Sequence, residues 1–166
     1  MTTWTIRPRA KNGLISAAAS IFIALAVGAI GGFATASSVT TWYRSLAKPA
    51  FNPPDAVFAP VWTTLYVVMA IAAWRVWRAD SAGRRRDTAL ILYAVQLILN
   101  LAWSLIFFGL RQTAIALVEV AVLWIAVLAT AVSFWRVDRP AGLAMIPYAA
   151  WVTFASVLNF EIWRLN

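Results

Sequence analysis

Five long apolar runs divide this sequence, with polar residues confined mostly to the short stretches between them. The runs lie at about 14–36, 58–76, 88–109, 112–135 and 142–163. Each holds about 20 residues, the length an α-helix needs to cross the hydrocarbon core of a bilayer. The pattern predicts an all-α integral membrane protein, a bundle of five transmembrane helices in which residues 1–166 form a single domain.

Composition supports this class and removes several kinds of chemistry. Hydrophobic residues make up 63% of the chain and charged residues only 12%, which is not the balance of a soluble domain. There is no cysteine and no histidine, so disulfides, thiol nucleophiles and imidazole-based relays or metal sites are excluded. We expect no metal and no obligatory cofactor.

The net charge of +8 has two interpretations. Nucleic-acid binding would need the positive charges on one face, whereas here they flank apolar runs, so we expect no nucleic-acid partner. Ten of the 14 Lys and Arg residues belong to the N-terminus and to the second and fourth connections. The positive-inside rule then predicts a cytoplasmic N-terminus and an external C-terminus, and helical spans with this charge pattern fit a bacterial cell membrane. Run 14–36 is too long for a signal peptide and is interpreted as a retained helix.

Small residues recur every fourth position in the first run. They are Ser16, Ser20, Ala24, Gly28, Gly32 and Ala36. Such a ridge lets another helix approach closely, because membrane helices associate through packing. The partner could be a neighbouring helix or a second subunit, and we favour the neighbouring helix.

A proline-rich stretch leads into the second run. Pro49, Pro53, Pro54 and Pro60 fall between Lys48 and Tyr66, and each fixes φ and lacks an N–H donor. We therefore predict a stiff, mostly non-helical segment over Lys48–Ala59, which overlaps a loop 37–57 that closes a binding site. Near the start of the fifth run, Pro147 predicts a local kink around Leu143.

Polar and aromatic side chains converge on one layer of the predicted bundle. With alternating helix directions, the half nearer loop 37–57 receives Trp62, Tyr66, Asn100, Trp103, Glu119, Trp151, Ala155 and Asn159. One face of run 88–109 carries Tyr93, Gln96, Asn100, Trp103 and Phe107. Gln96 and Asn100 could alternatively serve only as interhelical hydrogen-bonding groups. Glu119, an acid within hydrocarbon, is expected to have a specific polar partner such as Asn100 or a loop group.

Several stretches carry a family resemblance. They are Trp42-Tyr43 with KPAFNPP, PVWTTLY, the run QLILNLAWSLIFFGLRQ over 96–112, and PYAAWVTFASVLNFEIWR near the end. With five spans and ten tryptophans, the chain resembles the TspO/MBR family, the family of the translocator protein, tryptophan-rich sensory protein and peripheral benzodiazepine receptor.

The resemblance implies a five-helix bundle, commonly a homodimer, with a pocket under the loop between the first two helices. It implies binding of porphyrins such as protoporphyrin IX or haem, and of isoquinoline-carboxamide and benzodiazepine ligands. The corresponding pocket residues are Tyr43, Phe51, Pro53, Trp62, Tyr66, Asn100, Trp103, Trp151 and Ala155. The tryptophans used by family members in porphyrin photodegradation correspond to Trp62 and Trp151.

Two positions depart from the family pattern. Phe51 stands where the family usually has Trp, which keeps an aromatic wall without its N–H donor. The sterol motif near the C-terminus is incomplete, with Leu158 and Arg164 present but Phe160 in place of the required Tyr. Membrane lipid is an expected partner, and sterol only a weak one.

Three functions remain open. The leading hypothesis is a membrane receptor or sensor for tetrapyrroles, linked to tetrapyrrole regulation or stress response, with Arg44 or Lys48 near the ligand's acids. The second is an enzyme for light- and oxygen-dependent porphyrin breakdown through Trp62 and Trp151. The third, a porphyrin or sterol transporter, is disfavoured by the absence of an internal repeat. Any haem would lack His and Cys ligands.

Overall fold

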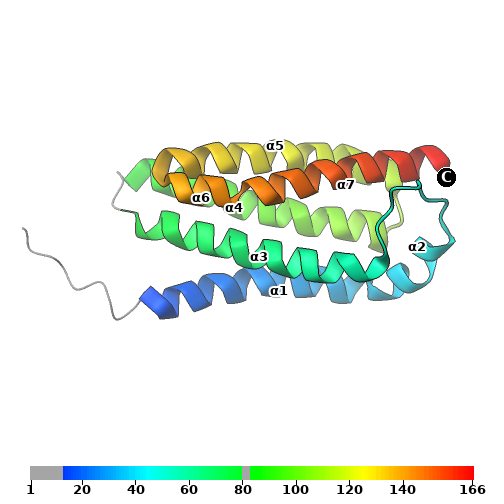
Figure 1. Cartoon of the computed structure of the whole chain (residues 1–166), viewed down its shortest axis with the longest axis horizontal. Helices are drawn as coiled ribbons and strands as arrows, with labels where there is room; N and C mark the ends of the chain where they lie inside the picture. The colour runs from blue at the N-terminus through cyan, green and yellow to red at the C-terminus, as the bar shows by residue number, and fades with distance from the viewer. Residues whose placement is uncertain (1–12, 80–82) are drawn as a thin grey trace, which may run out of the picture.

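The computed structural model describes residues 13–79 and 83–166 and shows an elongated helical bundle (Figure 1). Within these described residues, five segments are long and apolar enough to cross a membrane, which confirms the predicted class. The elements are α1 (Gly13–Thr40), α2 (Trp42–Ser45), α3 (Asp55–Arg78), α4 (Gly83–Ser104), the π-helical η1 (Leu105–Gly109), α5 (Thr113–Val137), α6 (Arg139–Ala144) and α7 (Ile146–Leu165). The chain is an integral, multi-pass membrane protein.

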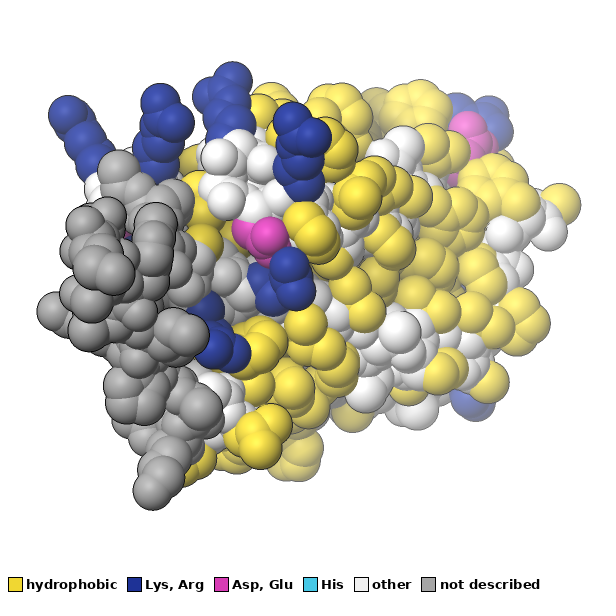
Figure 2. All heavy atoms as spheres, turned by 60° about the vertical axis from the view of Figure 1, so that its left-hand side comes forward, with side chains coloured by type: hydrophobic (Ala, Val, Ile, Leu, Met, Phe, Trp, Pro, Cys, Tyr) yellow, Lys and Arg dark blue, Asp and Glu magenta, His cyan; other side chains and the backbone are white. Residues whose placement is uncertain are grey.

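The two ends of the bundle differ in what covers them. At one end, here called the lid end, α2 and the irregular residues 46–54 connect α1 to α3, and the C-terminus lies nearby (Figure 1). The opposite end, here called the basic end, is where α1 begins. Figure 2 shows Lys and Arg side chains gathered at the basic end beside a belt of hydrophobic side chains. The charges predicted at Arg7, Arg9 and Lys11 lie outside the described residues.

The proline-rich lead-in is shorter than predicted. Helix α3 begins at Asp55, directly after Pro54, so the predicted non-helical segment Lys48–Ala59 is wrong for its last five residues. Pro60 lies within α3. It is only the sixth residue of the helix, and the first four N–H groups of any helix lack intrahelical partners, so Pro60 removes a single backbone hydrogen bond.

Pro147 predicted a local kink around Leu143, and the structure interrupts the helix two residues after Leu143. Helix α6 ends at Ala144 and α7 starts at Ile146, with Met145 as the single residue between them. Pro147 occupies the first turn of α7, where its missing N–H is tolerated. On the other side of the break, Asp138 caps α6 by accepting a hydrogen bond from the Ala141 N–H at 3.3 Å and also pairs with Arg75.

The small-residue ridge of α1 packs against α3, as favoured, over its first four members. The Ser16 hydroxyl accepts a hydrogen bond from Trp74 Nε1 at 3.1 Å, and the Ser20 hydroxyl donates one to the Ala70 carbonyl at 2.8 Å. Ala24 is fully buried. A Cβ atom on Gly28 would lie 2.5 Å from the ring of Tyr66. These contacts join α1 to α3 from the basic end to mid-bundle.

A tight connection joins η1 to α5 at the lid end. The Leu110 and Gln112 N–H groups bond to the carbonyls of Leu105 and Ile106 at 2.8 and 3.1 Å. Arg111 between them has φ of 58°, the left-handed region that few non-glycine residues adopt. The turn reverses the chain, so that α5 runs antiparallel to the continuous span formed by α4 and η1.

Candidate functional site

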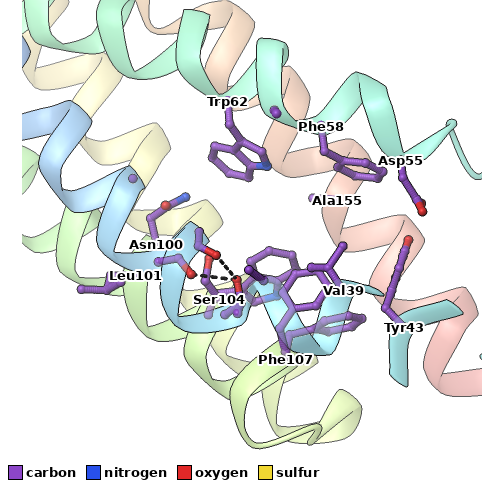
Figure 3. A pocket seen from close by; sticks show the side chains of 18 of the residues that line it. Val39, Tyr43, Asp55, Phe58, Trp62, Asn100, Leu101, Ser104, Phe107 and Ala155 are labelled. Carbon is purple, nitrogen blue, oxygen red and sulfur yellow. Dashed lines mark hydrogen bonds between the residues drawn. The ribbon is translucent and has the colours of Figure 1, made fainter. Parts of the chain in front are cut away.

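A cavity of about 670 Å³ lies in the lid-end half of the bundle. Its walls come from α1, α3, α4 with η1, and α7, and α2 borders its mouth (Figure 3). Nine aromatic side chains line it: Tyr43, Phe58, Trp62, Tyr66, Trp103, Phe107, Phe108, Trp151 and Phe154. This volume is in the range of about 300–1,000 Å³ typical of small-molecule sites.

The cavity begins where α1 and α3 stop touching. Gly28 is in close contact with Tyr66, but a Cβ atom on Gly32, one turn later, would meet nothing within 4 Å. Gly32 and Ala36 therefore line the cavity instead of continuing the helix contact. The predicted ridge thus has two roles, a packed seam and then a cavity wall.

A hydrogen-bonded triad lies at the cavity floor, and two of its members, Tyr66 and Asn100, line the cavity. The Tyr66 hydroxyl of α3 donates to Asn100 Oδ1 of α4, and Asn100 Nδ2 donates to the Tyr148 hydroxyl of α7 at 3.1 Å. Asn100 is 1% exposed. Because buried amides need partners, the triad confirms an interhelical role for Asn100 and also presents its polar edge to the cavity (Figure 3).

Aromatic rings make the two facing walls. Trp62 and Trp151 meet edge to face, with ring centroids 6.4 Å apart and planes at 88°. On the η1 side, Trp103 stacks on Phe107 at 5.4 Å. The Trp103 N–H donates to Asn159 Oδ1 at 3.1 Å, and Asn159 Nδ2 donates to the Thr113 carbonyl. These bonds hold the Trp103 indole in one orientation.

Charged and hydroxyl groups surround the mouth. The Tyr43 hydroxyl donates to Asn52 Oδ1 at 2.8 Å, and Lys48 Nζ lies 4.7 Å from the centre of the Tyr43 ring. Burial, with a smaller contribution from Asp55, raises the pKa of Tyr43 to about 12. Its phenol therefore stays protonated at neutral pH. Arg44 Nε lies 3.7 Å from Asp55 Oδ2.

Most of the residues predicted for the pocket surround this cavity. Tyr43, Trp62, Tyr66, Asn100, Trp103, Trp151 and Ala155 line it, as does Leu158 from the sterol-motif remnant. Phe51 and Pro53 are not among the lining residues; the Phe51 ring, 47% exposed, packs against Phe154 at 6.2 Å. Phe160 is exposed, and Arg164 pairs with Glu161 at 2.6 Å.

The expectation of a polar partner for Glu119 is wrong. Both carboxylate oxygens are buried, and neither has a hydrogen-bond partner among the described residues. The predicted partner, Asn100, already bonds to Tyr66 and Tyr148. An acid without a partner in an apolar bundle carries a desolvation cost.

Several lining residues were not predicted as site residues. Asp55 was placed in the non-helical lead-in and Phe58 where the lead-in overlaps run 58–76, and the helical start of α3 turns both towards the cavity. Gly31 and Thr35 of α1 lie beside the predicted ridge rather than on it. Phe107 shares the predicted face of Tyr93, Gln96 and Asn100, and this periodicity was the signal that could have included it.

Sequence comparisons agree with this architecture. Residues 20–164 match the model of the TspO/MBR family. The chain is 40% identical over 153 residues to the tryptophan-rich protein TspO of Chlorobaculum tepidum, covering 92% of this chain and 97% of that protein. It is 44% identical over 125 residues to the protein CrtK of Rhodobacter capsulatus, covering 75% of this chain and 78% of that protein.

A mammalian relative shows the same breadth. The translocator protein of Bos taurus is 38% identical over 141 residues, which cover 84% of this chain and 83% of the bovine protein. The family match over residues 20–164 includes every residue that lines the cavity and all of the five spans except the start of the first and the last residue of the fifth. It supports a role as a membrane sensor or receptor, and the chain belongs to the TspO/MBR family.

Proposed function

We propose that this protein is a membrane receptor or sensor that binds a tetrapyrrole, such as protoporphyrin IX or haem, in the lid-end cavity. The observation that carries the proposal is the cavity itself, about 670 Å³ in volume and walled by aromatic rings over a polar floor. Isoquinoline-carboxamide and benzodiazepine ligands, which are also largely apolar and aromatic, would compete for the same space. Sterol binding is expected to be weak.

The chemistry of the walls suits a porphyrin. A broad apolar macrocycle gains from burial against Trp62, Trp151 and Trp103, whose indoles provide large rigid surfaces. Neither His nor Cys occurs in the chain, so the usual side chains that ligate haem iron are absent. Affinity should follow the macrocycle, and haem and protoporphyrin IX should bind with similar strength.

Titration in detergent tests the proposal. Protoporphyrin IX added in the dark should quench tryptophan fluorescence saturably and shift its own absorbance band. The Trp62→Ala variant should weaken binding about tenfold, since an aromatic contact of about 1.4 kcal/mol is lost. Trp124→Ala is the matched control, because Trp124 bonds to Thr153 and does not line the cavity. Absence of saturable binding to the wild-type protein would reject the proposal.

A second candidate, porphyrin photodegradation, is favoured by one feature. Trp62 and Trp151 lie edge to face in the cavity wall, and the Trp151 N–H has no partner among the described residues. Under light and oxygen, an enzyme would bleach the bound porphyrin, whereas a receptor would leave its spectrum intact. Bleaching that needs oxygen and is lost in both Trp62→Phe and Trp151→Phe would favour the enzyme.

We also infer that the basic end faces the cytoplasm of a bacterial cell. Arg75, Arg84, Arg85, Arg136 and Arg139 are exposed there, and positively charged connections are retained on the cytoplasmic side. The chain has no native cysteine, so single-cysteine variants report orientation directly. An impermeant maleimide added to intact cells should label Ser45→Cys at the lid end and spare Asp87→Cys at the basic end.

A further inference from the structure

The cavity mouth carries a negative charge, although a porphyrin with carboxylates would be bound better by a positive one. Among the residues that line the cavity, Asp55 is the one with a formal charge, and it is negative. Figure 3 shows its side chain at the mouth, near Tyr43 and Phe58. A carboxylated ligand with its acid at the mouth would approach Asp55 and be repelled by it.

Arg44 is placed to change that interaction. It belongs to the short helix α2, and its Nε lies 3.7 Å from Asp55 Oδ2. The Arg44 side chain is 65% exposed and that of Asp55 41%. At this distance the contact is an ion pair, and the guanidinium N–H groups make no hydrogen bond within the described part of the chain. They remain able to donate to a second acceptor.

The second cation near the mouth is less suited to this task. Lys48 Nζ lies over the Tyr43 ring at 4.7 Å and within 3.4 Å of the Arg44 carbonyl. An ammonium is a point charge, whereas a guanidinium presents five donors in a planar fork that can serve two carboxylates at once. Arg44 also adjoins the acid that must be neutralised.

We propose that Arg44 bridges a ligand carboxylate to Asp55, so that this pair selects ligands carrying an acid at the cavity mouth. Asp55 holds the guanidinium at the mouth, and the ligand acid completes the second half of its donor set. Without Arg44 the same Asp55 would disfavour an acidic ligand. Arg44 and Asp55 are thus specificity-determining residues that link the lid to the first residue of α3.

The inference rests on the proposed tetrapyrrole site. Two probes distinguish binding at that site from the bridge that Arg44 forms to a ligand carboxylate. Protoporphyrin IX carries two carboxylic acids, and its dimethyl ester has the same macrocycle without the charge. Both are titrated in the dark into the wild-type protein in detergent, by tryptophan quenching. The wild type should prefer the acid by about three- to tenfold, the range expected for a partly exposed charged hydrogen bond.

Substitutions then test whether Arg44 and Asp55 cause the preference for the acid over the ester. Arg44→Gln should weaken binding of the acid about three- to tenfold and leave the ester unchanged; the ester also verifies that the variant is folded. Asp55→Asn removes the repulsive charge together with the ion pair that places Arg44; because that exposed pair is weak, acid binding should tighten, by up to about threefold. The double variant should regain part of the Arg44→Gln loss, because the two residues interact. Raising NaCl from about 0.05 to about 0.5 M should weaken acid binding only.

Equal affinity for acid and ester in both the wild type and Arg44→Gln would overturn the bridge and leave the tetrapyrrole site standing. Loss of ester binding in Arg44→Gln, matching the loss for the acid, would also overturn it, since the residue would then act through the fold. Failure of both probes to bind the wild type would reject the site and the bridge together.

Discussion

Along the contact between α1 and α3, the basic end and the lid end are packed in opposite ways. From Ser16 to Gly28, small residues of α1 meet the backbone or aromatic rings of α3 directly. From Gly32 onwards the same four-residue spacing continues, yet the helices separate and a cavity of about 670 Å³ opens. A small-residue ridge therefore permits close helix packing but does not require it. The side chains of the facing helix determine whether the two helices touch or leave a cavity between them.

Tyr66 marks the boundary between these two regions. Its ring covers Gly28 on the basic-end side, while its hydroxyl bonds to Asn100 at the cavity floor. The residue cannot move away from α1 without breaking the triad. Packing at the seam and the shape of the site are consequently coupled through a single side chain, and substitutions on either side of it should behave differently.

The largest effect is expected from a methyl group at the seam. Gly28→Ala should lower the free energy of unfolding by about 3 kcal/mol, the upper end for an over-packed core, because its Cβ would lie 2.5 Å from a Tyr66 ring held by Asn100. Gly32→Ala is the matched control and should be nearly neutral, since nothing lies within 4 Å. Denaturant unfolding in detergent measures both. Equal damage from the two variants would break the contrast between seam and cavity.

A gain in stability is expected outside both regions. Glu119→Leu should raise the free energy of unfolding by about 2 kcal/mol, because it removes a buried carboxylate that has no partner in the described structure. Porphyrin affinity should change little, since Glu119 does not line the cavity. Glu119→Gln, which keeps the shape and removes the charge, should gain less. A destabilised Glu119→Leu, or one that no longer binds porphyrin, would contradict this account.

Removing the amide of the cavity floor should have a moderate cost. Asn100→Leu leaves the Tyr66 hydroxyl without its acceptor and Tyr148 without its donor. Interhelical hydrogen bonds in membranes contribute roughly 0.6 kcal/mol on average, so the loss of two should cost about 1 kcal/mol. Tyr148→Phe breaks only one of the bonds and should cost about half as much. Thermal unfolding would show the order of the two variants, and a reversed order would argue against the triad.

The smallest effect is expected at a hydrogen bond within the seam. Ser20→Ala removes the 2.8 Å bond to the Ala70 carbonyl and should cost ~0.6 kcal/mol. Ser45→Ala at the exposed lid, where the hydroxyl bonds only to the Trp42 carbonyl of its own helix, should be neutral. If Ser20→Ala proved as costly as Gly28→Ala, hydrogen bonding rather than close packing would hold the seam together.

Much of the architecture was predictable because a bilayer limits the choices. A run of about 20 apolar residues has to form a helix when no water is available for its backbone groups, so five runs meant five spans. Faces within helices were also predictable, since residues three or four apart share a side. Tyr93, Gln96, Asn100, Trp103 and Phe107 were assigned to one face in this way and are all buried.

What the sequence left open depended on how neighbouring elements meet. Local rules for proline pointed to an extended Lys48–Ala59, but a helix that starts at Asp55 loses only one bond at Pro60 and turns Asp55 and Phe58 to the cavity. Glu119 was expected to bond to Asn100 or a loop group, but the Asn100 amide makes its hydrogen bonds to Tyr66 and Tyr148, which lie on other helices. Such pairings depend on how each helix is rotated about its axis and how deep it sits in the bundle relative to the helices that it contacts.

The sequence by itself determined five spanning helices, their buried faces, the ridge on α1 and the aromatic composition of the site, because hydrocarbon forces helical hydrogen bonding and residue spacing sets the faces. Only the tertiary structure decided where α1 and α3 separate, which side chains bond across the floor and which charge borders the mouth. Those outcomes arise from contacts between residues far apart in the chain. The Tyr66 side chain is the main example, because it contacts α1 at Gly28 towards the basic end and borders the cavity towards the lid end.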